Sequence, residues 1–200
     1  LSYGVFSAAF SANIDSKEHG TQNFAPERPR HRSFNETDLT LSYTHTLGKL
    51  GLTGGYVYYD TDYAPETQEL FASVSYDTIG RPTLSIYRDI DAYPGTYFNF
   101  SLAHSIKLVK EITLDLGASA GYMWGDGKYW KTLTSGTKYK AFHDGMVRAG
   151  LTIPLTQKVA LAPVVQYWFP LSHKAAKRNY NPNGRLESNV VGGATITYSF

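Results

Sequence analysis

The side chains best suited to acid–base or nucleophilic chemistry in this chain are its six histidines. Two fall on segments with an extended-chain pattern and four fall in or beside polar connections: His45 and His104, and then His19, His31, His143 and His173. A nucleophile and its base require a serine and a histidine on one face, oriented by a carboxylate. In the adjacent pair His104-Ser105, consecutive strand residues point to opposite faces, so these two cannot form a dyad. We therefore expect histidines of loops and interfaces, without a catalytic role.

Patterns for metals and cofactors are weak. Histidine ligands on a strand need a spacing of two, and the segments around His45 and His104 each offer one histidine. Oxygen ligands for a hard cation such as calcium could come from two acidic loops, namely Asp60, Asp62, Glu66, Asp89 and Asp91. Solvated loop charge is the alternative that we favour. Cysteine is absent, which excludes disulfides and thiolate chemistry, and no phosphate-binding glycine motif is present, so we expect no metal and no cofactor.

The elements that position these residues are extended strands, because apolar and polar residues alternate with a period of two along nearly the whole chain. The expected strands are Tyr3–Asp15, Asp38–Leu47, Gly51–Asp60, Glu69–Tyr76, Thr83–Asp89, Tyr97–Ile106, Ile112–Trp124, Asp144–Ile153, Val159–Phe169 and Asn189–Phe200. In the last strand one face is mostly apolar and the other mostly small and polar. This pattern is typical of a strand between lipid and a lumen.

The connections predict how these strands are arranged. Odd-numbered connections are long or medium, and even-numbered ones are tight turns, as in a barrel with long outer loops and short periplasmic turns. A soluble β-sandwich does not require this sorting. No apolar run approaches the ~18 residues of a membrane-spanning helix, and open sheet edges are not satisfied in lipid. Residues 1–200 are therefore predicted to form one all-β domain, a transmembrane antiparallel up-and-down β-barrel of ten strands with periplasmic termini.

Composition and the carboxyl end agree with this location. The chain has 16 tyrosines, whose apolar rings and polar hydroxyls suit membrane–water interfaces. Its net charge of +2 gives no signal for nucleic acid as a partner. The final Phe200, with Tyr198 two residues earlier, resembles the assembly signal of bacterial outer-membrane barrels. We therefore expect the barrel-assembly machinery among the partners.

Four segments carry a family resemblance: LSYGVFSAAFSANID, GLTGGYVYYDTDY, DAYPGTYFNFSLAHS and LDLGASAGYMWGD. They resemble an uncharacterised family of proteobacterial outer-membrane β-barrels, whose members are conserved hypothetical proteins. The similarity runs from Leu1 to Phe200 and implies the fold and the compartment, but it transfers no catalytic residue. Members typically carry another hairpin before the segment that resembles Leu1–Asp15. If that hairpin is missing here, the resemblance implies a native barrel of twelve strands.

Inward-facing side chains are the candidates for a lumen or a constriction: Asp77, Tyr87, Tyr97, Asn99, Asp115, Arg148 and Gln166. Asp115 and Arg148 lie on adjacent expected strands at different heights, so their direct pairing is open. Such charges either brace a narrow barrel by satisfying one another or line a constriction that selects solutes. Bracing is the alternative that we favour. Pro163 cannot donate to a ladder, which indicates a bulge that could move Val164–Phe169 to the other face.

Three of the long loops are basic. Their lysines and arginines are candidates for binding lipopolysaccharide phosphates or an acidic protein partner: Arg28, Arg30, Arg32, Lys128, Lys131, Lys138, Lys140, Lys174, Lys177 and Arg178. We favour the lipid interpretation, because every such barrel meets lipopolysaccharide at its outer surface.

Three functions are compatible with these features. The first is a non-enzymatic outer-membrane pore for polar solutes. The second is a barrel plugged by its own side chains that anchors a partner protein or complex. The third, well behind, is a membrane-embedded hydrolase or acyltransferase, which requires a histidine on one face with a serine or an aspartate. The expected partners are outer-membrane lipid and lipopolysaccharide, and a second copy or another protein remains open.

Overall fold

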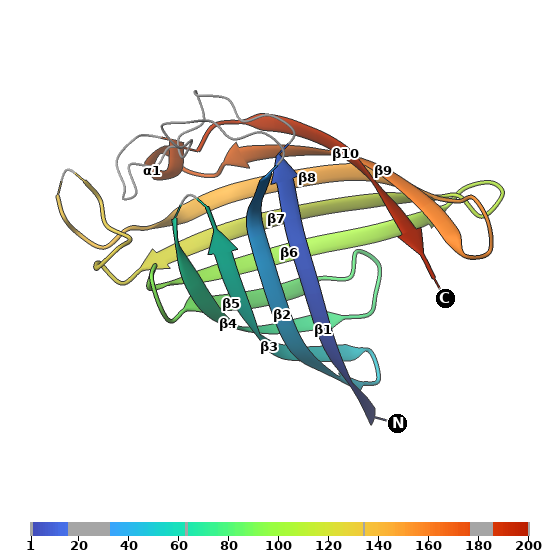
Figure 1. Ribbon diagram of the computed structural model, residues 1–200, viewed down its shortest axis with the longest axis horizontal. Coiled ribbons are helices and arrows are strands. Elements are labelled where there is room, and N and C mark those ends of the chain that lie inside the picture. The colour runs from blue at the N-terminus through green and yellow to red at the C-terminus, as the bar shows by residue number, and fades with distance from the viewer. Residues whose placement is uncertain (1, 16–32, 63, 134, 177–185, 200) are drawn as a thin grey trace.

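Ten antiparallel strands form one sheet in which the order of the strands follows the order of the chain (Figure 1). The computed structural model describes residues 2–15, 33–62, 64–133, 135–176 and 186–199. The elements are β1 (Ser2–Asp15), β2 (Ser33–Leu47), β3 (Leu50–Thr61), β4 (Ala64–Tyr76), β5 (Thr83–Asp89), β6 (Gly95–Lys107), β7 (Thr113–Gly125), β8 (Lys140–Pro154), β9 (Val159–Pro170), α1 (His173–Ala176) and β10 (Asn189–Tyr198). The all-β, up-and-down antiparallel fold that the sequence predicts is confirmed. Within the described residues, no helix has the length and apolar character needed to cross a membrane.

Three strands begin four or five residues earlier than their hydrophobic alternation predicts. β2 starts at Ser33, β4 at Ala64 and β8 at Lys140. The added residues pair with the neighbouring strand, as Phe34 does with Ile14. Polar residues interrupt the hydrophobic alternation at these strand ends. The backbone groups of polar residues nevertheless form ladder hydrogen bonds just as the backbone groups of apolar residues do.

Extension of the strands shortens two connections that were expected to be longer. Pairing of Thr61 with Ala64 reduces the β3–β4 connection to residues 62–63, and the β5–β6 connection is 90–94. Long connections therefore follow β1, β7 and β9, whereas the predicted alternation of loop length fails at the other two odd-numbered positions. Ser2 pairs with Leu47 and Tyr198 with Val159, so the described chain begins and ends on the side of the short turns.

Pro163 lies inside β9 without the predicted bulge. Leu161 pairs with Ile153 and Val164 pairs with Gly150, which is a single unbroken register. The side chains after Pro163 therefore keep the faces that strict alternation assigns to them.

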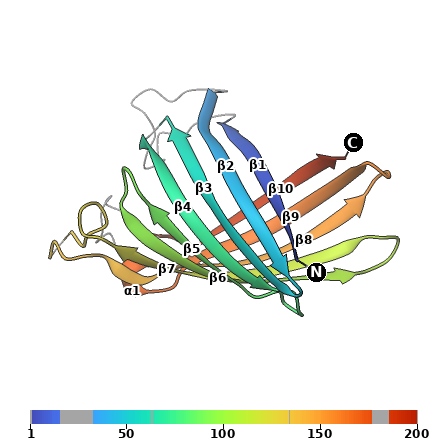
Figure 2. The same cartoon turned by 90° about the horizontal axis from the view of Figure 1, so that it is seen from below.

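The two faces of the sheet differ in chemistry. The sheet is strongly curved (Figure 2), and its concave face carries mostly polar, aromatic and small side chains. The opposite, convex face carries exposed apolar side chains such as Phe6, Phe10 and Ile196, whose exposed fractions are 85%, 73% and 72%. Buried hydrophobic residues among those described are few: Val57, Met123, Tyr139, Ala141 and Ala175. Three of these, Met123, Tyr139 and Ala141, form a small cluster near the end of the sheet that carries the long connections.

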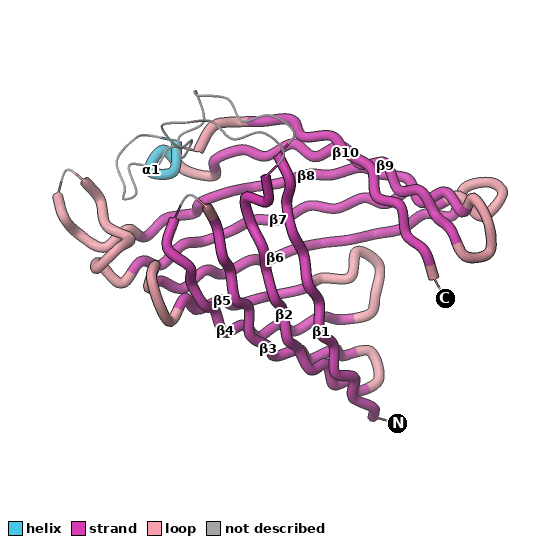
Figure 3. Tube along the Cα trace, viewed as in Figure 1, coloured by secondary structure: helices cyan, strands magenta, loops and turns pink. Residues whose placement is uncertain are grey.

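The two outermost strands are unpaired along one side. Within the described ranges, β1 pairs only with β2, and β10 pairs only with β9, so the sheet is not closed between its first and last strands (Figure 3). Every residue of β10 is exposed. Both strands therefore present free backbone donors and acceptors together with exposed apolar side chains.

Candidate functional site

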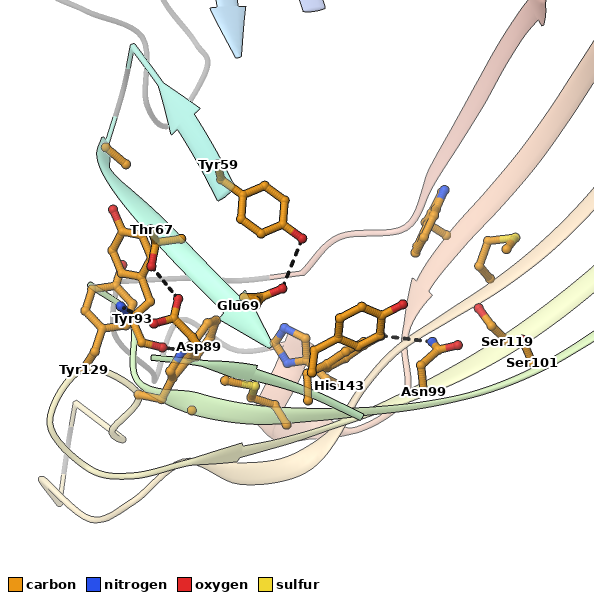
Figure 4. A pocket seen from close by; sticks show the side chains of 18 residues that line it. Tyr59, Thr67, Glu69, Asp89, Tyr93, Asn99, Ser101, Ser119, Tyr129 and His143 are labelled. Atoms are coloured by element: carbon orange, nitrogen blue, oxygen red, sulfur yellow. Dashed lines mark hydrogen bonds between the residues drawn. The ribbon is translucent and has the colours of Figure 1, made fainter. Parts of the chain in front are cut away.

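A cavity of about 760 Å³ lies on the concave face, at the end of the sheet with the long connections (Figure 4). Its walls come from β3–β9 and from the β5–β6 and β7–β8 connections. The main lining side chains are Tyr59, Thr67, Glu69, Tyr87, Asp89, Tyr93, Tyr97, Asn99, Ser101, Ser119, Met123, Tyr129, Trp130, His143, Met146 and Trp168. Aromatic rings predominate in this set, and it contains no lysine or arginine.

Two carboxylates face each other across the strands at one wall. Glu69 on β4 and Asp89 on β5 are directly opposed in the register of the two strands. Like charges in this position are destabilising, and each has its own donors. Tyr59 Oη donates to Glu69 Oε2 at 3.1 Å, and Thr67 Oγ1 donates to Asp89 Oδ2 at 2.7 Å (Figure 4). The two acids therefore remain side by side, and the described lining residues include no lysine or arginine to pair with them.

Asp89 also orders the β5–β6 connection. Its Oδ1 accepts hydrogen bonds from the backbone amides of Asp91 and Tyr93, at 3.0 and 3.1 Å. These contacts account for a carboxylate that is only 6% exposed. They assign a structural role to an acid that the sequence offered as a possible cation ligand. Within the described part of the chain, no group of three or more His, Cys, Asp or Glu side chains is arranged to hold a metal ion.

The neighbouring part of the wall is organised around Tyr97 on β6, which pairs in register with Tyr87 on β5. Its hydroxyl donates to the carboxylate of Asp144 on β8, 2.9 Å from either oxygen, and accepts from Asn99 Nδ2 at 3.3 Å. The strand between them, β7, has Gly121 at the crossing point, where any Cβ would overlap the Tyr97 hydroxyl. β8 carries an irregularity opposite Gly121, which places both His143 and Asp144 on the concave side.

His143 is held by aromatic neighbours. Its Nδ1 lies 2.8 Å from the Tyr139 hydroxyl, and its ring meets that of Trp130 edge-on at 6.0 Å between centroids. These contacts place the imidazole in the wall of the cavity, beside the small hydrophobic cluster of Met123, Tyr139 and Ala141.

Two connections cover the outer side of the cavity. Trp130, from the β7–β8 connection, folds over Gly95 and donates from Nε1 to the carbonyl of Tyr93 at 3.1 Å. Tyr93 in turn donates to the carbonyl of Pro65 at 2.9 Å, and its ring meets that of Tyr129 edge-on. Partial burial, and then the charge of Asp89, raise the pKa of Tyr93, so its hydroxyl remains a donor at neutral pH. The connections are thus joined to each other and to β4.

The predicted lumen residues are only partly brought together. Tyr87, Tyr97 and Asn99 line the cavity as a group. Arg148 and Gln166 pair in register on the same concave face, closer to the short turns, and Arg148 lies across Gly117.

The two remaining lumen candidates lie farther away. Asp115 is nearer still to the short turns, where it accepts hydrogen bonds from Ser105 and from Thr152, the latter at 2.7 Å. β4 ends at Tyr76, so Asp77 lies just past the strand, exposed at the start of the β4–β5 turn. Its amide donates to the carbonyl of Lys49, which continues the register of β3 with β4 by one residue.

Several residues of the cavity were not predicted. Tyr59 and Glu69 have the inward parity of their strands, so alternation alone could have found them. Asp144, the partner of Tyr97, likewise shares the inward parity of Arg148 on its strand, whereas Trp130 had no such signal, because it lies on a long connection that folds back. The glycines at 95, 121 and 125, which make room for large neighbours, were the available indication.

The candidate lysines of the outer connections are exposed. Lys128, Lys131 and Lys138 lie between β7 and β8, and Lys140 begins β8 with its Nζ 4.2 Å from the centre of the Trp124 ring. Lys174 on α1 donates to the carbonyl of Lys140 at 3.4 Å. Tyr198 is exposed at the end of β10. The other predicted residues of this kind, Arg28, Arg30, Arg32, Lys177, Arg178 and Phe200, lie outside the described residues.

Comparison of the chain with family models, with curated proteins and with solved structures finds no match. We therefore infer the chemistry of the cavity from its side chains. Rings such as Tyr87 and Trp168 offer faces for stacking or for a cation, and Glu69 and Asp89 supply negative charge. The arrangement suits binding or passage of a small solute.

Proposed function

We propose that this protein is an outer-membrane β-barrel that acts as a small, non-enzymatic pore for polar solutes. The observation that supports it is the distribution of apolar side chains between the two faces of the sheet. Phe10, Leu84 and Ile196 on the convex face are 73%, 49% and 72% exposed, whereas the concave face carries hydrogen-bonded polar groups. Polar side chains inside and apolar ones outside are the pattern of a transmembrane barrel.

A water-soluble chain of this size would place its large apolar residues in a core. Here the buried hydrophobic residues of the described chain are limited to the five named above, and most large aliphatic side chains are exposed. Soluble monomers rarely expose contiguous apolar patches of more than a few hundred Å². Lipid against the convex face accounts for this surface.

Closure of the sheet is part of the proposal. A strand edge in lipid leaves unsatisfied backbone groups that cost several kcal/mol each. We propose that the free edges of β1 and β10 are satisfied in the membrane, either by pairing with each other or through a further hairpin between them. Twelve strands with such a hairpin would match the uncharacterised proteobacterial barrels that the sequence resembles.

The ends of the convex face fit membrane–water interfaces. Trp124 is 48% exposed at the end with long connections, and Tyr76 and Tyr198 are 48% and 55% exposed at the end with short turns. Aromatic residues at both borders of an apolar band are typical of transmembrane barrels. Lys140, whose Nζ lies over the Trp124 ring, is positioned to reach lipopolysaccharide phosphates outside this border. Tyr198 and Phe200 would serve the barrel-assembly machinery on the periplasmic side.

The alternative is a barrel closed by its own side chains that anchors a partner. One observation favours it: Trp130 folds back over Gly95 and is hydrogen-bonded there, so it covers part of the concave face. The pore and the plugged barrel share the same fold and membrane location. They differ in whether solutes and ions pass through the lumen.

Ion conductance across planar phospholipid bilayers distinguishes these functions. The chain, refolded in detergent, should insert and give stepwise increases in current, and the heat-denatured chain should give none. Insertion without conductance would contradict the pore and support the plugged barrel. A chain that stays in the aqueous phase with native β-structure would contradict the membrane location itself.

A further inference from the structure

We propose that the cavity on the concave face binds an organic cation that carries apolar groups, such as an aromatic or quaternary amine. This inference deepens the proposed pore function by naming a solute class for the same lumen. Three features of the wall carry it, namely its charge, its aromatic faces and its size.

The charge of the wall is negative and unneutralised. Glu69 and Asp89 are directly opposed on β4 and β5 and both line the cavity, and Asp144 on β8 lies behind Tyr97, whose hydroxyl it binds. Among the described residues that line the cavity there is no lysine or arginine, and the donors to these three acids are the hydroxyls of Tyr59, Thr67 and Tyr97 and backbone amides. The carboxylates of Glu69 and Asp89 repel each other because like charges oppose each other directly across the two strands. A bound cation would reduce this repulsion.

Glu69 and Asp89 differ in how much of each carboxylate is occupied by hydrogen bonds within the protein. Asp89 is 6% exposed and accepts hydrogen bonds at both oxygens, which fix the β5–β6 connection. Glu69 is half-buried and accepts one from Tyr59 at Oε2. Glu69 is therefore the carboxylate placed to contact a solute. The negative charge of Asp89 adds to the electrostatic attraction for a cation.

The aromatic rings provide the apolar part of the site. Tyr87 lies between Phe71 and Tyr97, with ring centroids 5.6 and 6.3 Å away, and Trp168 faces the same cavity from β9. Tyrosine and tryptophan faces attract cations through their quadrupoles, and quaternary ammonium groups are bound in aromatic cages of this kind. A space of about 760 Å³ accommodates a ring with an alkylammonium group.

A set of three probes of similar size tests the charge preference. Benzyltrimethylammonium, benzyl alcohol and benzenesulfonate present a cation, a neutral group and an anion beside one phenyl ring. Their binding to the refolded protein in detergent can be measured by calorimetry and by quenching of tryptophan fluorescence, to which Trp130 and Trp168 contribute from the cavity wall. We expect the cation to bind at least about tenfold more tightly than either of the others.

Matched variants locate the site. Glu69→Gln should weaken binding of benzyltrimethylammonium about tenfold, whereas Glu66→Gln, the same change on an exposed residue of β4 with the opposite parity, should change it less than about twofold. Tyr87→Phe keeps the ring and should retain the affinity, and Tyr87→Leu should lose it. Circular dichroism and a melting curve for each variant verify that it is folded.

The outcomes separate this inference from the pore function. Equal binding of the three probes, or equal losses for Glu69→Gln and Glu66→Gln, would overturn the cation site even if the protein conducts ions. Selective binding of the cation with the expected variant pattern would establish the cation site even if the protein gives no conductance. In that case only the proposed pore function would be contradicted.

Discussion

The Tyr97 hydroxyl on β6 reaches across β7 and donates to the Asp144 carboxylate on β8, 2.9 Å from each oxygen. The crossing is possible because Gly121 leaves the space above β7 free. Three strands are thereby tied together on the concave face by side chains as well as by their backbone ladders. The same hydrogen bond fixes one wall of the cavity.

Loss of this hydrogen bond should destabilise the sheet. Tyr97→Phe removes the donor and leaves a half-buried carboxylate, so we expect the free energy of unfolding to fall by about 1–3 kcal/mol. Urea unfolding in lipid vesicles measures this change. In a double-mutant cycle with Asp144→Asn, the two losses should not add, since both remove one interaction. Additive losses would show that the pair is not coupled.

A methyl group at Gly121 should be worse tolerated than one elsewhere in the sheet. In Gly121→Ala the new Cβ overlaps the Tyr97 hydroxyl, and we expect a loss of about 1–3 kcal/mol in unfolding free energy. Gly193→Ala on β10 is the control, because no atom lies within 4 Å of the added Cβ there. If both variants unfold alike, the crossing is not tightly packed.

Trp130 should control access to the lumen. Its indole covers Gly95 and is tied to the Tyr93 carbonyl, so Trp130→Ala opens the outer side of the cavity. We expect a larger single-channel conductance than for the unmodified chain. Trp124→Ala is the control, since Trp124 lies on the convex face under Lys140. An unchanged conductance in Trp130→Ala would place the narrowest point elsewhere.

Arg148 should set part of the ion preference. It lies on the concave face, exposed, where it opposes Gln166 and crosses Gly117. Its removal in Arg148→Ala leaves a more negative lumen, so the reversal potential in a salt gradient should shift towards cation selectivity. A variant with an unchanged reversal potential and a lower melting temperature would instead show that Arg148 braces the barrel.

The strands and their faces were predictable, because alternation with a period of two reflects the geometry of an extended chain. β5 spans Thr83–Asp89 as expected, and Tyr97 and Asn99 share the concave face as predicted. At Asp77 the same rule was carried one residue past the end of β4, into the turn that follows. Alternation does not indicate where pairing stops, since that depends on the neighbouring strand.

The cavity was less predictable than the strands. Its two walls depend on contacts between residues far apart in the sequence, such as Tyr97 with Asp144 and Trp130 with Tyr93. The irregularity in β8 that brings His143 to the same face as Asp144 leaves no mark in the hydrophobic pattern. The free edges of β1 and β10 were likewise not predictable, because strand pairing depends on distant partners and not on local sequence.

The measurement that tests the central claim most directly is the unfolding free energy of Ile86→Arg in phospholipid vesicles. Ile86 lies on the convex face in the middle of β5, and it is 39% exposed. If this face meets the centre of a bilayer, the arginine should cost about 2–4 kcal/mol. Ile79→Arg is the control, because Ile79 is 85% exposed in the β4–β5 turn and should change stability by less than about 0.5 kcal/mol. Equal, small effects of the two substitutions would contradict a lipid-facing convex surface and with it the transmembrane barrel.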